Sequence, residues 1–158
     1  ESAGASFVKR DGSVWTTDKD GIIMCLLAAE IKAVTGLSPL SYYEKVCKRL
    51  GRSTYTKRCD TAVSKEEKIR IAALDKSDIG VVKLGNATIT DIETRSAYEN
   101  LSIGGIKIST ADGWIAARPS GTEDLYKLYS ESYRSDEEAE SLLQEGKVLI
   151  DEALRDKK

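Results

Sequence analysis

Residues 114–132 read WIAARPSGTEDLYKLYSES, two apolar runs joined by a short polar segment. The runs are rich in Trp, Ile, Leu and Tyr, which are typical of strands, and Pro, Ser and Gly between them are typical of a turn. The stretch therefore predicts a hairpin with one strand over residues 113–118 and a second over residues 125–133.

The turn of this hairpin carries groups that bind phosphate. Arg118 offers two parallel donors on a planar cation, and the hydroxyls of Ser120 and Thr122 are further donors. Gly121 permits a backbone shape that exposes N–H groups, and Pro119 fixes its own φ and keeps the turn from becoming helical. A turn that only reverses the chain needs no arginine, so we interpret residues 118–122 as a phosphate-binding loop.

A plain hairpin turn is the alternative interpretation of the same residues. Two carboxylates, Glu123 and Asp124, directly follow the turn, and Arg118 would pair with one of them. A motif this short also occurs by chance, so its spacing alone leaves both interpretations open.

The rest of residues 52–158 predicts an α+β domain, an antiparallel sheet flanked by helices. Ser64 and Ser135 each precede a glutamate by three residues, which is the capping-box pattern at a helix start. The second of these helices repeats apolar residues every three or four positions up to Ala153. The further elements that we expect are strands at residues 53–63, 81–84, 87–94 and 103–110, and a helix at residues 64–74.

Residues 1–51 predict the last strand and helix of an incomplete α/β domain, followed by a linker helix. We expect a strand at residues 5–8, then a helix capped by Thr17 with Asp20 as the capping-box acid, ending at Gly36. Residues 22–29 are apolar nearly all round, which is typical of a buried helix. A basic amphipathic helix follows at residues 41–50 and ends at Gly51. The chain is interpreted as a piece of a longer protein.

Composition excludes several classes of function. The 158 residues include 24 basic and 26 acidic side chains, so no net charge attracts nucleic acid or a membrane surface. The basic cluster between Lys45 and Arg58 is interpreted as a solvated helix face, with nucleic-acid binding as its alternative. The longest apolar run is too short to span a bilayer. Three cysteines without CxxC spacing favour the cytoplasm, and the absence of histidine excludes His-based triads and His metal sites.

Three segments together resemble one enzyme family. ESAGASF at residues 1–7, TTDKDGI at residues 16–22 and ARPSGTEDLYKLYSES at residues 117–132 are similar to the α-D-phosphohexomutases, most closely to their bacterial phosphoglucomutase branch. The resemblance implies a four-domain enzyme that interconverts glucose 1-phosphate and glucose 6-phosphate. It also implies a phosphoserine in the first domain, Mg²⁺ in the second, and glucose 1,6-bisphosphate as the intermediate.

The resemblance also implies roles for individual residues. Arg118, Ser120, Gly121 and Thr122 fall on the family's loop for the phosphate that does not react. Glu1 and Ser2 fall on the end of its sugar-binding loop, and Lys19 falls on a lysine near the bound sugar phosphate. No catalytic residue and no metal ligand of the family falls within this chain, so we expect it to be inactive alone.

The partners implied are a phosphosugar and the missing N-terminal domains of the same protein, with neither nucleic acid nor membrane. Residues 1–51 would lack the sheet that covers their apolar helix, so we expect self-association of the fragment or disorder of residues 1–35. Three alternatives stay open: a phosphomannomutase, a phosphoglucosamine mutase, or a non-catalytic module that binds phosphosugar or nucleic acid.

Overall fold

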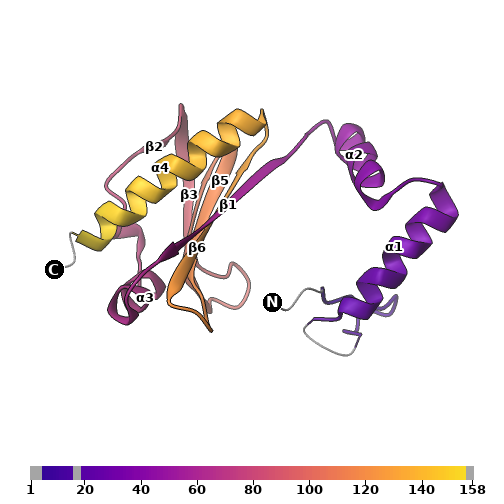
Figure 1. The fold of residues 1–158 in the computed structure, drawn as a ribbon, viewed down its shortest axis with the longest axis horizontal. Coiled ribbons are helices and arrows are strands. Elements are labelled where there is room, and N and C mark those ends of the chain that lie inside the picture. Colours follow the sequence, from indigo (N-terminus) through magenta and orange to yellow (C-terminus); the bar gives the residue numbers. More distant parts are fainter. Residues whose placement is uncertain (1–4, 16–18, 156–158) are drawn as a thin grey trace. The chain divides into compact units, whose positions relative to one another are not determined.

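The structure is a computed structural model that describes residues 5–15 and 19–155 (Figure 1). The chain divides into two compact units, Glu1–Arg52 and Ser53–Lys158, and each is described by itself.

The N-terminal unit contains two helices, α1 (Gly21–Thr35) and α2 (Pro39–Leu50). The predicted strand at residues 5–8 is wrong, because Ala5 and Val8 form only isolated bridges, to Asp20 and Val14. The first helix begins at Gly21, where the Asp20 carboxylate accepts hydrogen bonds from Ile22 N and Ile23 N at 2.9 and 3.0 Å. Asp20 is therefore the N-cap itself, and the predicted cap Thr17 lies outside the described residues.

The ends of both helices agree with the sequence, and α1 exposes apolar side chains, as expected for residues 1–51 without the sheet that would cover them. Both helices end at the predicted glycines, Gly36 and Gly51. No residue of α1 is buried, and Ile22 and Leu26 are 77% and 63% exposed. Three further apolar residues of α1 are half-buried, namely Ile23, Leu27 and Ile31. In the described part of the chain no single helix is long and apolar enough to cross a membrane, although α1 and α2, bent by 72°, pass that test as a pair.

The C-terminal unit is a six-stranded antiparallel sheet with helices, which confirms the predicted α+β class. The strand order is β1-β6-β5-β4-β3-β2. The bounds are β1 (Tyr55–Ala62), β2 (Lys83–Leu84), β3 (Ala87–Arg95), β4 (Ser102–Thr110), β5 (Gly113–Pro119) and β6 (Leu125–Ser132). The helices are α3 (Lys65–Ala72), the short 3₁₀ helix η1 (Lys76–Asp78) and α4 (Asp136–Arg155). The strand predicted at residues 81–84 is thus shorter, and the helix predicted at residues 64–74 ends at Ala72.

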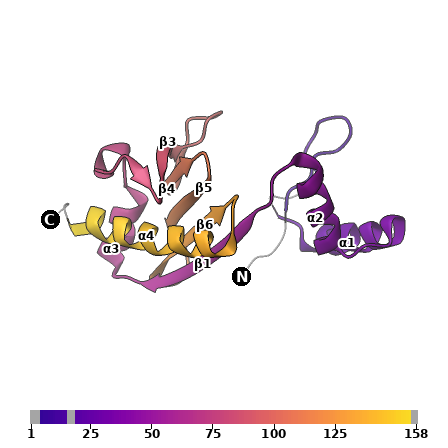
Figure 2. The ribbon, with the colours of Figure 1, turned by 90° about the horizontal axis from the view of Figure 1, so that it is seen from above.

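Helices α3 and α4 cover one face of this sheet, as Figure 2 shows. A single apolar core lies between these helices and the sheet. Strands β5 and β6 contribute Ile115, Ala117, Tyr126 and Leu128 to it. Because side chains alternate along a strand, the residues next to these lie on the opposite, helix-free face. Arg118 is one of them, so the register of β5 decides which face the candidate arginine occupies.

The predicted capping box of α3 is complete. At α4 only one of the two capping-box bonds forms, because the glutamate carboxylate binds a serine of β6 instead. Ser64 N donates to the Glu67 carboxylate at 2.8 Å, and Glu67 N donates to Ser64 Oγ at 3.2 Å. At the start of α4, Glu138 N donates to Ser135 Oγ, but the Glu138 carboxylate accepts from the Ser132 hydroxyl at 3.0 Å.

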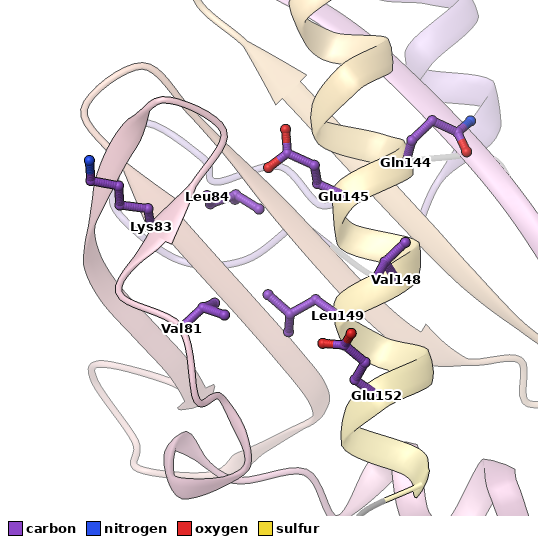
Figure 3. A pocket seen from close by; sticks show the side chains of 8 residues that line it. All are labelled: Val81, Lys83, Leu84, Gln144, Glu145, Val148, Leu149 and Glu152. Atoms are coloured by element: carbon purple, nitrogen blue, oxygen red, sulfur yellow. The ribbon is translucent and has the colours of Figure 1, made fainter.

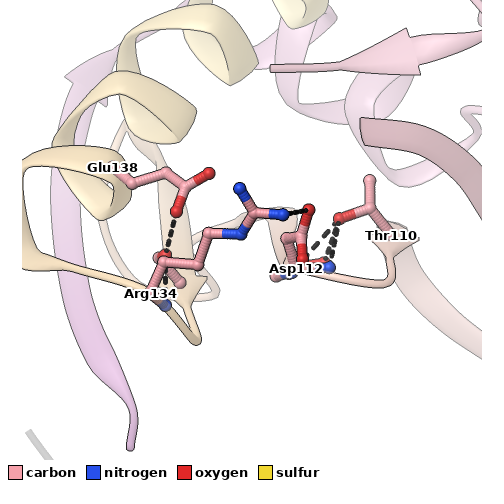
Figure 4. A network of polar contacts seen from close by, with 6 residues as sticks. Thr110, Asp112, Arg134 and Glu138 are labelled. Carbon is pink, nitrogen blue, oxygen red and sulfur yellow. Dashed lines mark hydrogen bonds and ion pairs between the residues drawn. The ribbon is translucent and has the colours of Figure 1, made fainter. Parts of the chain in front are cut away.

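A polar network continues from there to the turn between β4 and β5 (Figure 4). Arg134 pairs with Asp112 across 2.6 Å, and its backbone N–H donates to Ser132 Oγ at 3.0 Å. Within the turn, Thr110 Oγ1 donates to Gly113 O at 3.0 Å. These bonds tie the start of β5 to the end of β6, at the end of the hairpin away from residues 120–124.

Candidate functional site

The loop of residues 120–124 joins β5 to β6 and is closed by its own backbone. Pro119 lies opposite Tyr126 in the register of the two strands, and Ser120 N donates to Leu125 O at 2.9 Å. Ser120 is only 5% exposed, and its Oγ accepts a hydrogen bond from Glu123 N at 3.3 Å. The serine therefore shapes the loop from inside.

Residues 121–124 are all exposed, and Gly121 and Thr122 are the two among them without a negative charge. Gly121 does not adopt a positive φ, and a Cβ added to it would meet no atom within 4 Å. Nothing in the described residues therefore requires glycine at this position. Its absent side chain leaves open space beside the backbone N–H groups of the loop, where an anion could approach.

Arg118 lies at the end of β5 on the helix-free face of the sheet and is exposed. Within the described residues its guanidinium makes no hydrogen bond and no ion pair. The plain-turn interpretation expected a pair with Glu123 or Asp124, and this structure contains no such pair. The five N–H donors of the guanidinium are thus not used within the described residues.

Lys68 of α3 contacts the Glu123 backbone and the Asp124 carboxylate instead. Lys68 donates from Nζ to Glu123 O at 2.6 Å and lies 3.7 Å from an Asp124 carboxylate oxygen. Val63 N also donates to Asp124 O at 3.1 Å. Lys68 thereby neutralises part of the negative charge that would otherwise repel an anion from the loop.

Lys127 is a second cation beside the arginine. It lies directly opposite Arg118 in the pairing of β5 with β6, and it is only 7% exposed. On its other side it lies opposite Asp60 of β1. Hydrogen bonds from Arg58, at 2.8 and 2.7 Å, hold the pKa of Asp60 below its usual value, and the charge of Lys127 lowers it further.

Lys68 and Lys127 were not predicted from the sequence. Lys68 could not be found by pattern, because its contact depends on where α3 packs. Lys127 could have been found, because the hairpin register that pairs Pro119 with Tyr126 also pairs Arg118 with Lys127.

The remaining predicted site residues are not part of this loop. Lys19 is exposed and directly precedes the N-cap of α1 in the N-terminal unit. Glu1 and Ser2 lie outside the described residues. Among the residues that the structure describes, no cluster of three or more His, Cys, Asp or Glu side chains could hold a metal ion.

A separate hollow of about 350 Å³ lies between the β2 region and α4 (Figure 3). Apolar side chains such as Val81 and Leu149 form most of its wall, and Glu145 and Glu152 lie at its edge. The Glu145 carboxylate accepts a hydrogen bond from Gly85 N at 2.6 Å. Two carboxylates against the single cation Lys83, beside an apolar wall, are unsuited to a phosphate, so this hollow is not the candidate anion site.

Comparison with known proteins assigns the fold and the loop to one family. Residues 63–146, which include the whole loop, match the family model of the phosphoglucomutase/phosphomannomutase C-terminal domain. A phosphoglucomutase of Komagataeibacter xylinus is 48% identical over 135 residues, which are 85% of this chain and 24% of that protein.

Two archaeal relatives match over shorter stretches. A phosphoglucomutase/phosphomannomutase of Thermococcus kodakarensis is 35% identical over 44% of this chain and 15% of its own length. A probable phosphoglucosamine mutase of Thermococcus gammatolerans is 41% identical over 37% of this chain and 13% of its own length. The chain thus spans about a quarter or less of the length of the relatives that it matches. It belongs to the phosphoglucomutase/phosphomannomutase family, and its residues 63–146 are that family's C-terminal domain.

Proposed function

We propose that this chain is the C-terminal part of a phosphoglucomutase that interconverts glucose 1-phosphate and glucose 6-phosphate. Its contribution is to bind the phosphate that does not react. The observation that carries the proposal is the exposed Arg118 guanidinium, which makes no bond within the described residues and precedes the exposed Gly121 and Thr122 by three and four residues.

The loop has the chemistry that a phosphate dianion requires. Arg118 can donate two parallel hydrogen bonds to two phosphate oxygens, and Thr122 can donate a third from its hydroxyl. The backbone N–H groups around Gly121 add partial positive charge, and Lys127 adds a full charge from the neighbouring strand. With one phosphate held in this way, the sugar is oriented for reaction at its other end, so the loop acts by positioning.

The division of labour follows the two parts of the chain. Residues 52–158 form the phosphate-binding domain, and residues 1–51 are the tail of a sugar-binding domain to which Glu1, Ser2 and Lys19 contribute. The serine that transfers the phosphoryl group, Mg²⁺ and the contacts to glucose 1,6-bisphosphate at the reacting end belong to other domains of the longer, cytoplasmic enzyme. The chain alone is therefore inactive.

A titration with glucose 6-phosphate, followed by ¹⁵N–¹H NMR on the 158-residue chain, tests the proposal. We expect saturable shifts at the Arg118 Nε–H and at the Gly121 and Thr122 amides. Arg118→Ala should abolish these shifts, whereas Arg155→Ala, which removes an exposed arginine on α4, should not. Equal binding by the wild type and Arg118→Ala would contradict the proposal.

Gly121→Ala provides a sharper version of the same test. The added methyl group meets nothing in the protein, so the melting temperature should stay within about 2 °C of wild type. If the phosphate lies against the loop backbone, the methyl group should still weaken binding severalfold. Unchanged binding by this variant would show that the phosphate does not approach Gly121.

A further inference from the structure

Strand β4 is irregular where it passes Arg118. Two steps along β3, from Glu93 to Arg95, match five steps along β4, from Lys107 to Ser102, so β4 contains extra residues at this point. Gly104 lies within them with a φ of 67°, a left-handed conformation that most side chains disfavour. Its N–H donates to Ser102 Oγ at 3.1 Å. The strand therefore bends at Gly104.

The bend brings the next residue, Gly105, against the backbone of β5. Gly105 is buried, and a Cβ added to it would overlap the carbonyl oxygen of Ala117. The same Cβ would come within 3.1 Å of both Cα and Cβ of Arg118. Only glycine lets β4 approach β5 this closely, and the contact is made at the base of the candidate arginine.

Arg118 is thus enclosed on both sides within the sheet. Gly105 packs against it from β4, and Lys127 lies opposite it on β6. The regular pairing of β4 with β5 ends at Ile106 and Ala117. Gly105 comes directly after it and contacts the C-terminal end of β5 at Arg118.

We propose that Gly104 and Gly105 are positioning residues for Arg118, which set the point and direction from which its guanidinium reaches the phosphate. This inference rests on the proposed phosphate-binding function. A side chain at residue 105 would push β5 away and move Arg118, and a displacement of about 1 Å is enough to weaken an oriented contact strongly.

The chain offers a matched control at the other end of β5. Gly113 is also buried, and a Cβ added to it would overlap Glu131 O and come within 3.2 Å of Ser132 Cα. Gly113→Ala should therefore strain the sheet as Gly105→Ala does, but at the end of the hairpin away from the loop.

Both variants are tested in the 158-residue chain by thermal unfolding and by titration with inorganic phosphate, with NMR detection of the Arg118 amide and Nε–H. We expect both to lower the melting temperature. Only Gly105→Ala should shift the Arg118 signals in the free protein and weaken phosphate binding at least tenfold. Unshifted Arg118 signals, or equal phosphate affinity of the two variants, would overturn the inference.

A second pair of variants covers the case in which Gly105→Ala does not fold. Asn tolerates the left-handed conformation at residue 104, whereas Val does not. Gly104→Asn should bind phosphate within about twofold of wild type, and Gly104→Val should bind at least threefold more weakly. Equal affinities would overturn the inference. If the wild type binds no phosphate, the proposed function fails, while the Arg118 signals of the four variants still decide whether these glycines position the arginine.

Discussion

Arg118 of β5 lies directly opposite Lys127 of β6, on the helix-free face of the sheet. Like charges that face each other directly across two strands destabilise a sheet. Asp60 lies on the far side of Lys127. An anion bound at Arg118 would lower the repulsion between the two cations.

Lys127→Met separates the effect of the Lys127 charge on stability from its effect on phosphate binding. Methionine keeps most of the buried volume and removes the charge, so the free energy of unfolding should change by less than about 1 kcal/mol. Phosphate affinity should fall about tenfold, on the order of 1.4 kcal/mol, because a nearby cation is lost. Urea unfolding and phosphate titration measure the two quantities. Lys107→Met is the control, since Lys107 is paired with Glu93 at 2.7 Å and should not affect binding.

A second prediction concerns the tether between α3 and the loop. Lys68→Met removes the hydrogen bond to Glu123 O and the charge beside Asp124, and should cost about 1 kcal/mol of stability. The amides of residues 121–124 should then exchange faster with solvent, and phosphate binding should weaken because Asp124 is no longer neutralised. Hydrogen exchange followed by NMR measures the first effect. Lys76→Met is the control, because it breaks an exposed pair with Asp91. If the two variants exchange these amides at equal rates, Lys68 does not hold the loop.

Tyr126 leads to a prediction about alkaline pH. Its side chain is fully buried, and burial raises the pKa of its hydroxyl to about 12. The neighbouring Thr61 offsets part of that rise, but the hydroxyl makes no hydrogen bond within the described residues. An unfolded tyrosine ionises near pH 10. The contribution of the neutral Tyr126 to stability is therefore complete below pH 10 and is lost as the pH rises toward 12.

Tyr126→Phe should consequently be as stable as wild type at pH 7, or more stable, because it removes a buried hydroxyl without a partner. Between pH 7 and pH 11 the wild type should lose about 1.4 kcal/mol more unfolding free energy than the variant. Urea unfolding at the two pH values tests this. Tyr98 is 99% exposed, so Tyr98→Phe should behave as wild type. An identical pH dependence of Tyr126→Phe and wild type would contradict the assigned pKa.

The local parts of the fold were predictable because local residues determine them. The capping box of Ser64 and Glu67, the apolar stripe of α4 and the hairpin around residues 118–125 all follow from spacing along the chain. Contacts between distant elements were not predictable in this way. The approach of Lys68 to the loop and the bend at Gly104 depend on how α3 and β4 pack, and spacing carries no signal for either.

At the site itself, composition indicated the loop but not the arrangement of its parts. The sequence suggested that Gly121 supplies an unusual backbone shape, yet the positive φ belongs to Gly104 on another strand. The sequence likewise left open whether Arg118 pairs with Glu123 or Asp124. In the structure Lys68 contacts the Asp124 carboxylate and the Glu123 backbone carbonyl, which a single strand-and-turn pattern could not reveal.

The measurement that tests the phosphate-binding role of Arg118 most directly is the steady-state kinetics of a chimera. The matching C-terminal quarter of the Komagataeibacter xylinus phosphoglucomutase would be replaced by this chain. Arg118→Ala in the chimera should lower kcat/KM for glucose 1-phosphate roughly 30- to 1,000-fold, or about 2–4 kcal/mol, and Arg118→Lys should restore only part of it. A value for Arg118→Ala within about twofold of the unmutated chimera would contradict the account.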